Sequence, residues 1–91
     1  MAFEEYGQPK GAYYTPALIA IFADADGAEA ALESLRAAGF TPRDIDVAQE
    51  SDRVTVIVSE PTPGMLEQAR ALLAASPARE VRPYGSGTDP L

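Results

Sequence analysis

Two short runs of the chain have the composition of buried β-strands. Residues 17–23 are apolar at every position between Pro16 and Asp24, and residues 53–58 are β-branched nearly throughout. Successive side chains of a strand point to opposite faces, so a strand that is apolar on both faces is buried on both. The two runs therefore predict central strands of a sheet, over residues 17–23 and 53–59.

The residues after the first run follow the period of an amphipathic helix. Asp26 and Glu29 have the spacing of a capping box, and Gly39 suits the position after the last turn, where glycine adopts a positive φ without strain. We expect a helix over residues 27–38. Its apolar stripe consists of Ala28, Ala31, Leu32, Leu35 and Ala38.

Three further elements are predicted in the rest of the chain. Residues 44–49 alternate between apolar and polar side chains, as an edge strand does, and residues 50–52 suit a hairpin turn. Residues 63–75 begin with a proline, which suits the first position of a second helix. Residues 80–84 can form only an edge strand, because Pro83 lacks the N–H that an inner strand donates.

These elements follow one another in the order βαββαβ. With the first and third strands central and the other two at the edges, this order is the ferredoxin-like arrangement. An internal offset of 37 residues, which aligns Gly27 with Gly64 and Leu35 with Leu72, supports two related halves. We expect an α+β fold in which a four-stranded antiparallel sheet carries two helices on one face.

The predicted ferredoxin-like domain spans residues 17–84. Before it, residues 1–16 combine glycines and prolines with four aromatic side chains, which predicts an irregular N-terminal arm. After it, the composition of residues 85–91 is typical of a flexible tail.

The composition excludes several kinds of chemistry. The chain has no Cys and no His, so it can hold no disulfide, thiolate nucleophile, Cys/His metal site or Ser-His-Asp triad. Its formal net charge of −7 argues against binding a phosphate backbone, and the third strand has no aromatic residue to stack on bases. No segment has the pattern of a signal peptide or a membrane span. We therefore expect a cytoplasmic protein with no nucleic-acid or membrane partner.

The acidic residues indicate no catalytic pair. Acid–base catalysis needs a desolvated carboxyl group, whereas turns and an exposed edge strand keep carboxylates hydrated. We predict no catalytic residue, no metal site and no cofactor. The four carboxylates that lie closest in the sequence are Asp44, Asp46, Glu50 and Asp52.

The turn between the first strand and the first helix is the candidate ligand site, with Asp24, Asp26 and Gly27 as its residues. An EF-hand loop that starts at Asp24 would need Glu where Leu35 stands, so the acids do not match that motif. Capping of the helix explains the same acids. Alternatively, the Asp-x-Asp-Gly turn resembles the Asp-x-x-Gly turn of ACT-type regulatory domains, which implies an unidentified small ligand. Both interpretations remain open.

One face of the predicted sheet stays uncovered, because two helices cover only the other. A contiguous apolar patch is seldom left bare on a monomer, so either a second subunit or the aromatic arm covers it. We expect a homodimer that packs through the open sheet face, to which the arms also contribute. The interface candidates are Phe3, Tyr6, Tyr13, Tyr14 and Phe22.

Residues 18–47 resemble a known family. The pattern consists of the apolar strand 18–22, a short acidic turn, the helix that starts Ala28-Glu29-Ala30-Ala31-Leu32, the pair Gly39-Phe40 and the turn Pro42-Arg43-Asp44-Ile45. It is similar to the small bacterial heat-induced and general-stress-protein domain. This resemblance implies a ferredoxin-like fold and an association with stress, but no enzymatic mechanism. Six Arg against one Lys, with seventeen Ala, are also typical of a GC-rich bacterial genome.

We therefore predict a non-enzymatic bacterial interaction or regulatory module. The alternative is an ACT-like small-ligand sensor that uses residues 24–27. A cofactor-independent oxygenase or isomerase of the dimeric-barrel kind is the third interpretation.

Overall fold

The structure is a computed structural model, and it describes Phe3, Tyr6, Gly7 and residues 17–59 and 63–84. The order βαββαβ is confirmed, with one short 3-10 helix added before the second strand. The elements are β1 (Ala17–Phe22), α1 (Ala25–Ala37), η1 (Pro42–Asp44), β2 (Ile45–Gln49), β3 (Val54–Ser59), α2 (Pro63–Ala74) and β4 (Glu80–Tyr84). Every predicted element lies within two residues of its expected bounds.

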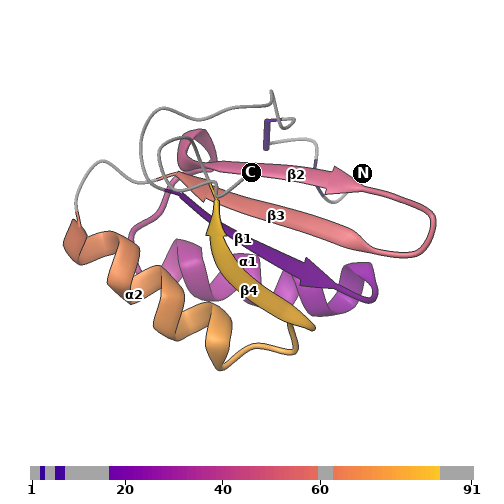
Figure 1. Cartoon of the computed structure of the whole chain (residues 1–91). Coiled ribbons are helices and arrows are strands. Elements are labelled where there is room, and N and C mark those ends of the chain that lie inside the picture. Colours follow the sequence, from indigo (N-terminus) through magenta and orange to yellow (C-terminus); the bar gives the residue numbers. More distant parts are fainter. Residues whose placement is uncertain (1–2, 4–5, 8–16, 60–62, 85–91) are drawn as a thin grey trace.

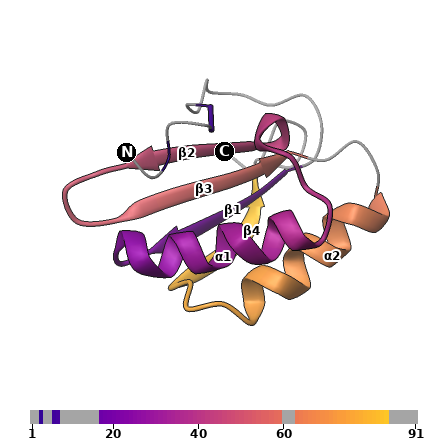
Figure 2. The ribbon, with the colours of Figure 1, turned by 180° about the vertical axis from the view of Figure 1, so that it is seen from behind.

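The four strands form one sheet in the order β2-β3-β1-β4, and all three pairings are antiparallel. The strands expected at the centre, β1 and β3, are central, and Pro83 lies in the edge strand β4. The helix α1 lies behind the sheet in Figure 1 and in front of it in Figure 2. Ala69 and Leu73 of α2 share one buried cluster with the α1 residues, so both helices pack on the same face. The fold is thus α+β and compatible with a ferredoxin-like arrangement.

The core follows from the two faces of the central strands. Leu18, Ala20 and Phe22 of β1 point to the helices and are fully buried there, together with Val56 and Val58 of β3. The alternate residues point to the opposite face, which we call the far face. The helix-side core also contains Ala28, Ala31, Leu32, Leu35, Phe40, Ile45, Val47, Val54, Ala69 and Leu73.

The start of α1 corrects the expected cap, because the N-cap is Asp24 and not Asp26. Asp24 has an extended backbone (φ −149°, ψ 172°), and its Oδ1 accepts the Gly27 N–H at 2.9 Å. Both aspartates have the chemistry of a cap. Asp24 takes the role because the chain turns from β1 into the helix within two residues, which starts the helix at Ala25.

The end of α1 confirms the role of Gly39. This glycine has φ +108°, and its N–H donates to the Arg36 carbonyl at 2.9 Å. The Phe40 N–H donates to the Leu35 carbonyl at 3.0 Å, which completes a Schellman motif. The buried Phe40 side chain then joins the core beside the helix that it terminates.

Candidate functional site

The turn from β1 into α1 has a clear role in the fold. The Asp24 carboxylate holds the first turn of the helix, while Asp26 is exposed. A β-carbon at Gly27 would lie 3.3 Å from Cγ of Pro77 and 3.5 Å from Cδ2 of Phe22. Glycine therefore lets the segment after α2 pack closely against the helix start. These contacts favour capping and packing as the reason for the Asp-x-Asp-Gly pattern, and small-ligand binding there stays a prediction.

Asp44 serves a local turn. It stands in η1, directly before β2, and its Oδ2 accepts both the backbone N–H of Thr41 at 3.3 Å and the Thr41 hydroxyl at 3.1 Å. The two residues thus form a capping box that sets the start of the 3-10 helix. This carboxylate points back to its own turn rather than to the other acidic residues.

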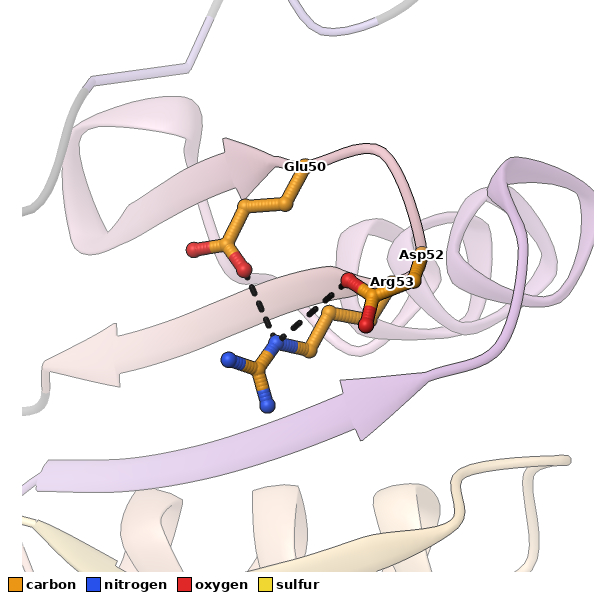
Figure 3. Close-up of polar contacts among 3 residues, drawn as sticks. All are labelled: Glu50, Asp52 and Arg53. Carbon is orange, nitrogen blue, oxygen red and sulfur yellow. Dashed lines mark hydrogen bonds and ion pairs between the residues drawn. The ribbon is translucent and has the colours of Figure 1, made fainter.

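Glu50 and Asp52 lie in the hairpin loop between β2 and β3, where both meet Arg53 (Figure 3). Nε of Arg53 lies 2.8 Å from Oε1 of Glu50 and 3.9 Å from Oδ1 of Asp52, and all three side chains are exposed. The hydrogen bond from Arg53 to Glu50 is the main cause that raises the pKa of the guanidinium. An exposed ion pair at a loop tip steadies the hairpin weakly and offers no desolvated carboxyl for catalysis.

The described part of the chain contains no group of three or more Asp or Glu side chains that could hold a metal ion. Within the same residues, no helix is both long enough and apolar enough to cross a membrane.

The far face carries an apolar centre of Ala17, Ile19 and Ile57, which form a second cluster of buried residues. Ile19 of β1 pairs with Ile57 of β3. Asp46 of β2 lies next to Ile57, and Arg82 of β4 lies next to Ile19. Within the single chain these three apolar side chains expose only 8% or less of their surface. Neither α1 nor α2 lies over this face (Figure 1). The expectation that this face leaves its apolar side chains bare is therefore wrong at Ala17, Ile19 and Ile57, which are buried within the single chain.

A second row crosses the far face next to this cluster. Thr55 of β3 pairs with Ala48 of β2 on one side and with Ile21 of β1 on the other. All three are half-buried, and Glu80 of β4 ends the row. We call Ala48, Thr55 and Ile21 the central row. It is the part of the far face with accessible apolar surface near the middle of the sheet.

The outer edge of β2 holds a short piece of the N-terminal segment. Gly7 forms a parallel bridge with Asp46: its N–H donates to the Ile45 carbonyl at 3.3 Å, and its carbonyl accepts the Val47 N–H at 2.8 Å. The Tyr6 N–H donates to the Phe3 carbonyl at 3.1 Å, so a turn joins the two aromatic residues. We call Phe3, Tyr6 and Gly7 the N-terminal anchor.

The two aromatic side chains of this anchor belong to the main core. Phe3 exposes 9% and Tyr6 7% of its surface, and both join the cluster under the helices. The guanidinium carbon of Arg36 on α1 lies 5.8 Å from the centre of the Tyr6 ring, within the range of a cation–π contact. Burial raises the pKa of the Tyr6 hydroxyl, and the charge of Glu33 raises it further. The anchor therefore links β2 to α1.

The interface candidates lie in different places. Phe22 is fully buried on the helix side, because it alternates in phase with Leu18 and Ala20. Phe3 and Tyr6 also pack in the helix-side core rather than on the far face. Tyr13 and Tyr14 lie outside the described residues.

Sequence patterns did not reveal the bridge between Gly7 and Asp46, which are far apart in the chain. The sequence predicted only that Phe3 and Tyr6 belong to an irregular aromatic arm. The sequence pattern does not indicate that this segment binds at β2. The bridge between Gly7 and Asp46 depends on where the assembled sheet has its outer edge.

Comparisons with protein-family models, with curated proteins and with solved structures find no match to this chain. The resemblance to the heat-induced and general-stress-protein domain therefore stays a prediction.

Proposed function

We propose that the chain is a non-enzymatic interaction module of the ferredoxin-like class, and that its partner is a second copy of itself, bound at the far face. The strand order β2-β3-β1-β4 and the single helical layer support the fold assignment. The acidic residues support a non-enzymatic role, because Asp24 and Asp44 cap helices, and Glu50 and Glu80 form exposed ion pairs with Arg53 and Arg82.

The central row is the observation that carries this proposal. Ala48, Thr55 and Ile21 place small and apolar side chains side by side on three neighbouring strands, on the face that neither α1 nor α2 covers. Charged residues stand toward the edges of the face, with Asp46 on β2 and Glu80 on β4. An apolar middle with a polar border is the usual anatomy of an interface between copies of one chain.

Sedimentation at micromolar concentration tests the homodimer. We expect twice the 9.6 kDa of one chain. The substitution Thr55→Glu places a carboxylate in the middle of the face, where a dimer interface would bury it without a partner of opposite charge. This variant should sediment as a monomer with an unchanged circular dichroism spectrum.

The matched control is Ala71→Glu, which adds the same charge at an exposed position of α2. It should leave the dimer intact. A wild-type chain that sediments as a monomer, or a Thr55→Glu variant as dimeric as the control, contradicts the proposal.

The other expectations rest on the sequence alone. The bacterial origin, the association with stress and the cytoplasmic location stay predictions, as does the ACT-like alternative.

A further inference from the structure

The two outer strands of the sheet, β2 and β4, differ in how their outer edges are protected. The outer edge of a sheet presents N–H and C=O groups with which a strand of another chain can pair. Successive residues of a strand direct these groups alternately to its two sides. The hydrogen bonds of Gly7 show that Ile45 and Val47 direct their groups to the outer side of β2, and by the same alternation Gln49 does so as well.

The outer edge of β4 is blocked by the residues of the strand itself. When the alternation is followed across the three antiparallel pairings, Pro83 has its backbone groups on the outer side of β4. The Ile21 carbonyl accepts the Arg79 N–H at 2.7 Å and thus faces β4, as this alternation requires. Pro83 has no N–H to offer to a further strand, and the exposed side chains of Arg82 and Glu80 form an ion pair of 3.3 Å on the same strand. A proline and charged side chains are the usual protection of a sheet edge.

The residues of β2 give its outer edge no such protection. The residues that direct their backbone groups outward, Ile45, Val47 and Gln49, include no proline and no charged side chain. Two copies of β2 can pair antiparallel with Val47 opposite Val47, which sets Ile45 opposite Gln49 and Asp46 opposite Ala48. Within the strand, this register brings no like charges opposite each other. The β2 edge is therefore the edge at which two copies of this chain can join.

The N-terminal anchor covers this edge. Gly7 binds the Ile45 carbonyl and the Val47 N–H, and the buried rings of Phe3 and Tyr6 hold it there. We propose that the anchor is a removable cap, an autoinhibitory contact that keeps β2 from pairing with β2 of a second copy. The bridge at Gly7 contains two hydrogen bonds, whereas β2 pairs with β3 over five residue pairs, so the anchor can leave while the sheet stays folded. This inference concerns the sheet edge and not the far face, so it does not depend on the proposed homodimer.

Sedimentation of a variant with an opened β2 edge tests this proposal. Tyr6→Ala removes one buried ring, and Gly7→Pro removes the N–H that donates to the Ile45 carbonyl. At about 100 µM protein and roughly 0.15 M salt, we expect the double variant to sediment with about twice the mass of the wild type or more. The same comparison is made with Thr55→Glu in every chain, which excludes association through the far face. The gain in mass should persist there, whatever the outcome for the homodimer.

Substitutions of Gln49 in the opened variant show whether the association uses the β2 edge. Gln49→Pro removes an outward N–H, as Pro83 does on β4, and should restore the mass of the wild type. Gln49→Ala is the matched control, because it changes the same exposed side chain but keeps the N–H, and it should leave the gain in mass unchanged. An opened variant with the mass of the wild type, or a gain in mass that Gln49→Pro does not reverse, overturns the proposal. If the double variant loses its helical circular dichroism signal, Gly7→Pro alone carries the same comparison with both rings in place.

Amide hydrogen exchange of the wild-type chain tests whether the cap is removable. The Val47 N–H donates to the Gly7 carbonyl, whereas the alternation directs the Val56 N–H of β3 to β1, inside the sheet. A cap that leaves by local opening exposes the Val47 N–H alone, so Val47 should exchange at least about tenfold faster than Val56. Equal exchange rates at the two residues would mean that the anchor leaves only when the whole chain unfolds, which rejects a removable cap.

Discussion

Gly39 and Gly64 allow the substitution of glycine by alanine to be tested at one position with a positive φ and at one position within a helix. A β-carbon at either glycine would meet no atom within 4 Å, so packing contributes little to both replacements. Gly39 has φ +108° after the end of α1, whereas Gly64 is the second residue of α2. The difference between the two alanine variants therefore isolates the cost of the backbone conformation.

Gly39→Ala should lower the free energy of unfolding by about 1 kcal/mol. A side chain at positive φ costs about 1–2 kcal/mol, and φ +108° lies beyond the centre of the left-handed region. The smaller conformational entropy of alanine in the unfolded chain offsets part of that cost, by about 0.4–1 kcal/mol. Gly64→Ala incurs no such strain and should raise the unfolding free energy by several tenths of a kcal/mol, because alanine favours the helix.

Urea titration followed by circular dichroism at helical wavelengths measures both changes. A loss of about 1 kcal/mol corresponds to a midpoint lower by roughly 0.3–1 M at the usual dependence on urea. Gly39→Asn should fall between glycine and alanine, because asparagine tolerates the left-handed region better. If Gly39→Ala left the midpoint unchanged or raised it as Gly64→Ala does, the Schellman ending of α1 would be wrong.

The remaining predictions concern the cap of α1 and the N-terminal anchor. Asp24→Ala removes the carboxylate that accepts the Gly27 N–H and should cost about 1 kcal/mol in urea unfolding. Asp26→Ala is its matched control and should cost much less; the reverse order would restore Asp26 as the cap. Because burial raises the pKa of Tyr6 above 10.0, its contribution to stability is complete below about pH 10 and is lost as pH rises through the folded-state value. Tyr6→Phe should therefore lose less stability than the wild type above pH 10 in urea titrations, and equal losses would argue against burial of this hydroxyl.

The local patterns of the chain were enough to predict its four strands, its two α-helices and their order, though not the short 3-10 helix η1. The apolar run at 17–23 had to be a central strand because both of its faces avoid water, and the position of Pro83 confined the last strand to an edge. Gly39 marked the end of α1 because few other residues accept its backbone conformation. Each of these inferences depends only on residues that are neighbours in the chain, so the sequence alone contains the information.

Interactions between distant residues were decided only in the tertiary structure. The capping-box spacing of Asp26 and Glu29 favoured Asp26 as the cap, yet the short connection from β1 selected Asp24. Phe3 and Tyr6 were expected to cover the far face, yet they pack under α1, where the β2 edge offers unpaired backbone groups and the core offers room for two rings. An aromatic residue in an irregular segment gains stability in any apolar site that it can reach. The site that such a residue reaches depends on the shape of the assembled sheet and helices. A local sequence pattern does not predict that shape.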